Sequence, residues 1–118
     1  MSDPSGIDPQ GLAILKRIGG ADFVKQMIDL FLKEAPDRLQ AAREGEKAGD
    51  LKAVTEATHS LQSSARQFGA VRLANLAGRI EIMTSENSSE NLSGLLGDLE
   101  RAYATARAWL ESERDSLV

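Results

Sequence analysis

Hydrophobic residues recur at three- and four-residue spacing along most of the chain, as on one face of an α-helix. No stretch alternates strictly between apolar and polar residues, which is the pattern of a half-buried strand. Runs of β-branched and aromatic residues typical of strands are also missing from the sequence. The pattern therefore predicts an all-α protein.

Glycine and proline divide the first half of the chain. Asp8 followed by Pro9 is typical of an N-cap with proline at the first helical position, and Gly19-Gly20 predicts a stop. We therefore expect a short helix from about Pro9 to Ile18, with Leu12, Leu15 and Ile18 on one face. A long helical segment follows as far as the Gly49-Asp50 turn, and Pro36 in its middle predicts a kink or a restart.

Three more helices are expected in the second half. Asp50 is a candidate N-cap and Gly69 a candidate C′ residue for a helix of about 18 residues. A further helix is predicted over about 71–83, followed by a polar loop over 84–89 and a last helix from Leu92 to near the C-terminus.

Four long amphipathic helices with short connections favour one architecture. We expect an antiparallel up-down four-helix bundle, with the short N-terminal helix packed across one end. A chain of 118 residues with 42% apolar residues allows one core. The prediction is a single domain over 8–115, preceded by a flexible N-terminus over 1–7.

Composition narrows the partners. The net charge of −4, without a cluster of Lys and Arg, argues against a nucleic-acid surface. The sequence contains no run of about 18 apolar residues, so no membrane-spanning helix is expected. The absence of Cys removes disulfides, thiolate catalysis and Cys-ligated zinc. The acidic start without an apolar stretch does not resemble a signal peptide. We expect a cytoplasmic protein, and a monomer because a charged bundle needs no partner to fold.

Most kinds of site lack their parts in this sequence. It has no glycine-rich phosphate loop, no calcium-loop pattern and no pair of His at metal-binding spacing, so neither a metal nor a cofactor is expected on the chain. One reactive group remains, the single histidine His59.

The helical wheel places His59 on the exposed side of its helix. At about 100° per residue, an apolar stripe lies roughly opposite it. The apolar stripe consists of Val54, Ala57, Leu61, Ala65 and Phe68. The side of His59 carries the polar residues Lys52, Thr55, Glu56, Gln62, Ser63 and Arg66. Gln67 lies at the margin of the stripe. An exposed imidazole is largely neutral at pH 7, and one ring nitrogen then keeps a lone pair that can act as a nucleophile. Glu56 or a Ser hydroxyl could hold the other nitrogen. On the wheel alone, a surface histidine without a role is the favoured interpretation.

The segment 58–70, Thr-His-Ser-Leu-Gln-Ser-Ser-Ala-Arg-Gln-Phe-Gly-Ala, carries a resemblance that changes this balance. It resembles the signature of histidine phosphotransfer (HPt) domains, approximately H-x-L-K-G-S-S/A-x-x-x-G-A. The matching residues are His59, Leu61, Ser64, Ala65, Gly69 and Ala70. The flanking segments 31–36 and 48–50 are also similar to the family, and the likeness spans about residues 8–112.

The resemblance implies a phosphoryl carrier of bacterial multistep two-component relays. His59 would accept a phosphoryl group from a receiver-domain phosphoaspartate and pass it to another receiver, and Gly69 would be a structural residue of the motif. It implies receiver domains and a hybrid sensor histidine kinase as partners, and Mg²⁺ on the receiver. It implies that the chain is a phosphoryl carrier, not an enzyme, and has no ATP-binding kinase domain of its own. Thr55, Glu56, Gln62, Ser63, Arg66 and Gln67 would lie near the phosphoryl group or the partner.

Two residues depart from the family pattern. Gln62 and Ser63 stand where the family usually has Lys and Gly. Gln62 can donate only neutral hydrogen bonds to an anion, and Arg66 could supply the missing positive charge. Ser63 adds a hydroxymethyl group where a partner approaches.

Three alternatives follow from these departures and from the plain helical pattern. The chain could bind or sequester a receiver without efficient transfer, or accept phosphate from a kinase acting in trans. It could also be a bundle with an unrelated adaptor role, in which His59 is idle.

Overall fold

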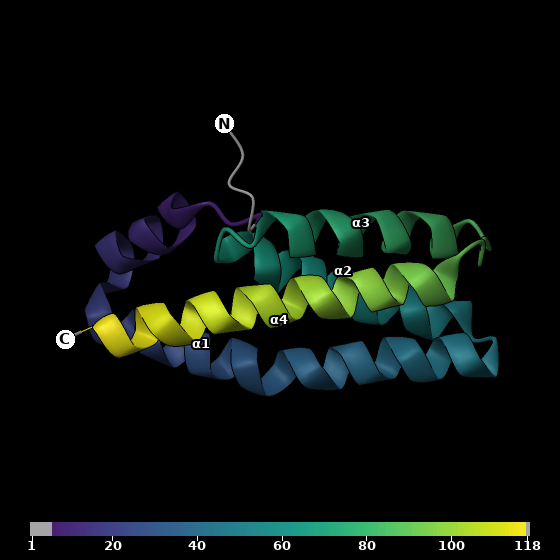
Figure 1. Ribbon diagram of the computed structural model, residues 1–118, viewed down its shortest axis with the longest axis horizontal. Coiled ribbons are helices and arrows are strands. Elements are labelled where there is room, and N and C mark those ends of the chain that lie inside the picture. The colour runs from purple at the N-terminus through teal and green to yellow at the C-terminus, as the bar shows by residue number, and fades with distance from the viewer. Residues whose placement is uncertain (1–5, 118) are drawn as a thin grey trace.

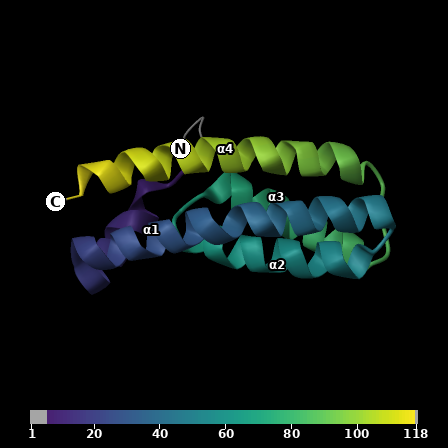
Figure 2. The same cartoon turned by 90° about the horizontal axis from the view of Figure 1, so that it is seen from below.

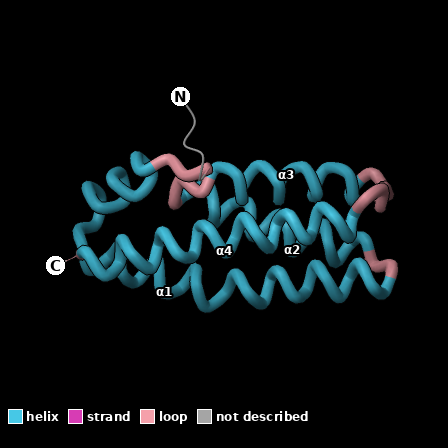
Figure 3. Tube along the Cα trace, viewed as in Figure 1, coloured by secondary structure: helices cyan, strands magenta, loops and turns pink. Residues whose placement is uncertain are grey.

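The computed structural model describes residues 6–117 and consists of helices joined by short turns (Figure 1). The helices are α1 (Pro9–Ala48), α2 (Leu51–Gln67), α3 (Val71–Ser85) and α4 (Leu92–Ser116). The turns lie at the two ends of the bundle, so successive helices run in opposite directions (Figure 3). The predicted antiparallel bundle is therefore confirmed.

The break at the paired glycines divides α1 into two rods. Asp8 caps the first rod by accepting a hydrogen bond from the backbone N–H of Gln10 at 3.0 Å, and Pro9 occupies the first turn, as predicted. Gly20 has φ 83° and ψ −179°, a backbone conformation that favours glycine, and the helix axis changes direction there. The rod before Gly20 lies across one end of the bundle, as expected (Figure 1).

Of the kink or restart predicted at Pro36, the restart is wrong. Gly20 is the one residue inside α1 with non-helical dihedral angles, and helical backbone continues through Pro36. Pro36 is exposed, so its ring projects toward solvent and the unpaired carbonyl of the preceding turn can be hydrated.

Each long helix packs against two neighbours. α2 lies between α1 and α3, and α4 closes the bundle by contacting α3 and α1 (Figure 2). Because the Cα traces of α2 and α4 do not approach each other among the described residues, these two helices are diagonal. One side of α2 is consequently left open to solvent.

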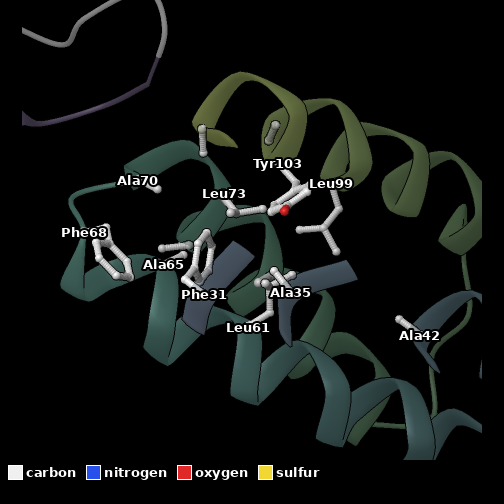
Figure 4. Packing of buried hydrophobic residues seen from close by; sticks show 14 of the residues in the cluster. Phe31, Ala35, Ala42, Leu61, Ala65, Phe68, Ala70, Leu73, Leu99 and Tyr103 are labelled. Carbon is white, nitrogen blue, oxygen red and sulfur yellow. The ribbon is translucent and has the colours of Figure 1, made fainter. Parts of the chain in front are cut away.

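Apolar stripes of all four helices meet in one core (Figure 4). The rings of Phe31 and Phe68 have centroids 5.2 Å apart, and Tyr103 lies 6.0 Å from Phe31. The stripe predicted for α2 is buried as expected, with Val54 and Ala65 fully inaccessible. Burial of a side chain such as Val54 or Leu61 stabilises the fold by about 1.5–3 kcal/mol.

The apolar face predicted for the first rod includes one residue, Ile18, that the structure leaves exposed. Ile18 is 73% exposed because coverage of the first rod fades toward the break at Gly20: Leu12 is buried and Leu15 only partly. Val71, in the first turn of α3, is 43% exposed.

The expected flexible N-terminus over 1–7 needs a correction in its last two residues. Residues 1–5 lie outside the described residues. Ile7 is 6% exposed, and the Gly6 carbonyl accepts a hydrogen bond from the backbone N–H of Arg72 at 2.9 Å. Gly6 and Ile7 are thus part of the packed domain. Within residues 6–117, no helix combines the length and apolarity needed to cross a membrane.

Candidate functional site

His59 lies on the open side of α2. The cap at Asp50, which accepts a hydrogen bond from the backbone N–H of Ala53 at 3.1 Å, fixes where this helix begins. The apolar stripe then turns inward, and the neighbouring Thr58 is 0% exposed while the His59 side chain is 66% exposed. The exposure predicted from the wheel is confirmed.

A carboxylate from the adjacent helix holds the imidazole. Glu81 of α3 places Oε2 at 2.7 Å from His59 Nδ1, and its side chain is 24% exposed. The sequence suggested Glu56 or a Ser hydroxyl for this role, and neither hydrogen-bonds the ring within residues 6–117. Glu81 is 22 residues further along the chain, and its approach depends on how α3 packs against α2.

This hydrogen bond selects a tautomer of His59. An ionised carboxylate only accepts hydrogen bonds, so the proton of a neutral ring stays on Nδ1. The lone pair is then on Nε2, which has no hydrogen-bond partner within the described residues. The arrangement is that of an exposed, oriented nucleophile.

Gln62 joins Glu81 to Arg66. The amide orientation that satisfies both neighbours has its nitrogen donating to Glu81 Oε1 at 2.9 Å and its oxygen accepting from Arg66 Nη2 at 3.0 Å. Gln62 and Arg66 are therefore linked to His59 through the Glu81 carboxylate. The Gln62 amide is directed at Glu81, which no pattern within α2 indicates.

The other predicted neighbours have different surroundings. Thr55 is turned toward α3, where its Oγ1 lies 2.8 Å from Thr84 Oγ1. The Ser63 hydroxyl is exposed and donates to the His59 carbonyl at 3.3 Å. Glu56 is exposed and makes no hydrogen bond or ion pair within residues 6–117.

Gly69 ends α2 as predicted. Its φ of 75° is left-handed, the N–H of Ala70 bonds the Ala65 carbonyl at 3.0 Å, and the N–H of Gly69 bonds the Arg66 carbonyl at 3.2 Å. These bonds form a Schellman motif. The backbone N–H of Asp8 donates to the Gly69 carbonyl at 2.7 Å, so this turn also anchors the start of α1.

A cleft between α1 and α2 lies on the other side of His59 from Glu81. Ser60, Ser64 and Gln67 line its α2 wall, and the α1 wall is formed by Met27, Leu30, Phe31, Glu34, Ala35 and Arg38. Leu30, on the α1 wall of this cleft, is 51% exposed. Sequence patterning could not separate this cleft-lining face of α1 from the core.

Comparisons with known proteins agree on one family. The model described as "Hpt domain" matches residues 26–109. The phosphorelay protein LuxU of Vibrio vulnificus, in strains YJ016 and CMCP6, is 26% identical over 105 residues, covering 88% of this chain and 91% of the relative. The crystal structure of histidine-containing phosphotransfer protein B from Pseudomonas aeruginosa PAO1 superposes with a TM-score of 0.91 at 23% identity, covering 98% and 100% of the two chains. The last likeness shows the fold.

Proposed function

This chain belongs to the Hpt domain family and has a histidine phosphotransfer role in a phosphorelay, and we propose that His59 is the residue that carries the phosphoryl group. It is the single histidine of the chain. The observation that carries the proposal is the 2.7 Å contact between its Nδ1 and Glu81 Oε2, which leaves Nε2 of a 66% exposed side chain as the nucleophile.

The proposed step balances without a proton leaving the ring. The Nε2 lone pair attacks the phosphorus of an aspartyl phosphate, a P–N bond forms, and the P–O bond to the aspartate breaks with its electrons on the carboxylate. The proton stays on Nδ1, so the phosphorylated ring becomes cationic. The Glu81 carboxylate faces that new positive charge. The reverse sequence returns the group to an aspartate of another receiver.

The partners supply the remaining chemistry. A receiver domain with its own Mg²⁺ would neutralise charge on the phosphoryl oxygens, as metal ions do in phosphoryl transfer. A hybrid sensor kinase would phosphorylate that receiver, so the role requires no ATP site in this chain. We place the protein with these partners in the cytoplasm, as a monomer.

The α1–α2 cleft supports a docking role for this side of the molecule. Its apolar floor and exposed Leu30 lie beside α2, within a few residues of His59, and Glu34 and Arg38 add a polar rim. An apolar centre with a charged rim is the usual make-up of a protein interface. A receiver seated there would have its aspartate within reach of the imidazole.

Transfer of label from a phosphorylated receiver to this protein tests the proposal. Purified protein is incubated with a receiver phosphorylated by acetyl phosphate, or with an active hybrid kinase and radiolabelled ATP. We expect a label that is labile in acid and stable in base on the wild type, and none on His59→Gln. Circular dichroism of His59→Gln should be that of the wild type, because the replaced side chain is exposed.

Three results would each contradict a part of the proposal. Label retained by His59→Gln would move the phosphoryl group to another residue. A wild type that binds a receiver and is never labelled would identify a sequestering module instead, the alternative that Gln62 and Ser63 suggested. Labelling by a kinase and ATP without any receiver would identify a phosphoacceptor acting directly for a kinase.

A further inference from the structure

Both oxygens of the Glu81 carboxylate are occupied. Oε2 accepts from His59 Nδ1 at 2.7 Å, and Oε1 accepts from the Gln62 amide nitrogen at 2.9 Å. A glutamate side chain has several rotatable bonds, and one hydrogen bond leaves much of that freedom. Two bonds in different directions fix the plane of the carboxylate, and therefore the direction in which it holds the imidazole.

Gln62 is itself held from its other end. Its amide oxygen accepts from Arg66 Nη2 at 3.0 Å, so the amide plane is fixed by a carboxylate on one side and a guanidinium on the other. Hydrogen bonds to charged groups are stronger than neutral ones. The chain of contacts from Arg66 through Gln62 and Glu81 to His59 spans α2 and α3.

Gly78 provides the space for this bridge. A Cβ built at this position of α3 would lie 2.5 Å from the terminal amide of Gln62, closer than side-chain atoms approach. Gly78 is buried in the interior of a helix, where glycine costs about 1 kcal/mol relative to alanine. The amide of Gln62 therefore lies directly on the backbone of α3 beside Glu81.

We propose that Gln62 is a positioning residue for the phosphoacceptor, acting through Glu81 to keep the His59 proton on Nδ1 and the lone pair on Nε2. The effect of Gln62 on phosphoryl transfer rests on the proposed function. The effect of Gln62 on the His59 tautomer does not depend on that function. The sequence suggested that glutamine here would face the phosphoryl group as a weak donor. The structure gives its amide two other partners.

Nitrogen NMR of His59 tests this directly, since the two ring nitrogens give separate signals for each tautomer and the protein contains one histidine. We expect the Nδ1–H form to dominate in the wild type. Gln62→Leu should lower the fraction of the Nδ1–H tautomer and raise that of the Nε2–H tautomer, which a free histidine side chain favours. Gly78→Ala should have the same effect, because the added methyl group would displace the Gln62 amide from Glu81. Gln62→Lys, which can donate to Glu81, should restore it.

Ser63→Ala is the matched control, because it alters an exposed residue next to Gln62 without touching Glu81. Its tautomer ratio should equal that of the wild type. In transfer assays we expect Gln62→Leu to be slower by about tenfold, the size of effect expected when one hydrogen bond to a charged group is lost, and Gln62→Lys to approach the wild-type rate.

An unchanged Nδ1–H fraction in Gln62→Leu would overturn the proposal, and if that variant does not fold, an unchanged fraction in Gly78→Ala would overturn it. The NMR measurement needs no receiver. Failure of every receiver to label the protein would therefore count against the proposed function alone, while the tautomer result would still decide the role of Gln62.

Discussion

At the scale of single residues, the proposed chemistry depends on the pairing of His59 with Glu81. The imidazole is neutral before transfer and cationic afterwards, so a neighbouring carboxylate favours the phosphorylated state more than the free one. The pair is partly exposed, and such ion pairs are worth about 1 kcal/mol or less in water. Glu81 is thus expected to shift the equilibrium of the relay as well as its rate.

Glu81→Gln removes the negative charge and keeps an oxygen that can accept from Nδ1. The NH2 group that replaces Oε1 can no longer accept from Gln62, so this variant loses that hydrogen bond as well. We expect the equilibrium constant for phosphoryl transfer from a receiver to His59 to fall by about fivefold, which corresponds to about 1 kcal/mol. Glu56→Gln is the control, since it removes the same charge from an exposed position on α2 without a bond to the ring. An equal shift in both variants would show that only net charge matters.

At the scale of elements, the turn at Gly69 both ends α2 and packs against the start of α1. Gly69 has to be left-handed to complete the Schellman motif, and the Asp8 backbone carbonyl lies where a side chain would be placed. The turn thus ties the α2–α3 connection to the start of α1.

Gly69→Ala should destabilise the protein by about 2–4 kcal/mol, since left-handed strain of about 1 kcal/mol adds to an overlap with backbone that cannot move freely. A Cβ there would lie 2.1 Å from the Asp8 carbonyl oxygen. Gly49→Ala is the matched control, because its φ of 71° is similar and no atom of residues 6–117 lies within 4 Å of its Cβ position. It should lose only about 1 kcal/mol. Urea denaturation measures both, and equal losses would contradict the steric argument.

The cleft between α1 and α2 is a second feature that no single helix contains. Leu30→Glu introduces a charge on its exposed apolar edge. We expect receiver affinity to fall by about tenfold, in the range of a moderate interface residue, with the thermal stability little changed.

Ala104→Glu provides the control for this substitution. It adds the same charge at an exposed position of α4, the helix diagonal to α2. Isothermal titration with the receiver compares the two variants. Unchanged affinity in Leu30→Glu would place the docking surface elsewhere.

At the scale of the whole molecule, ion pairs between helices close the bundle away from the site. Arg43 of α1 donates to Glu100 Oε1 of α4 at 2.8 Å, and near the other end Arg114 Nη2 donates to Asp29 Oδ2 at 3.0 Å. The hydrogen bond from Arg114 holds the pKa of Asp29 below its ordinary value of 3.8, against a smaller opposing effect of burial.

This pairing makes an acid-sensitive contribution to stability. Because the folded-state pKa of Asp29 is lowered, the contribution is present above pH 3.8 and is lost as the pH falls through the lowered value. We expect Asp29→Asn to be less stable than the wild type at neutral pH, with the difference shrinking below about pH 4. Urea midpoints from pH 7 to pH 2 measure it.

Asp37→Asn serves as the reference for Asp29→Asn. It removes an exposed carboxylate of α1 that forms no ion pair within residues 6–117. A stability difference in Asp29→Asn that does not change with pH would show that the Arg114 contact contributes nothing.

The sequence by itself determined the helices and the exposed histidine, because both depend on local rules. Periodicity placed four long helices, Asp8 and Asp50 placed their caps, and the glycines marked where the chain turns. The phase of the apolar stripe in α2 was enough to turn His59 outward.

Only the tertiary structure decided what surrounds that histidine. Which residue of α3 meets the imidazole depends on the rotation and height of one helix against another, and spacing within a helix carries no record of either. Glu81, the bridge through Gln62 over Gly78, and the cleft beside Leu30 all arise from that packing. Because this packing is not encoded in the spacing within α2, Gln62 was expected to face the phosphoryl group, whereas its amide hydrogen-bonds the carboxylate of Glu81 on α3.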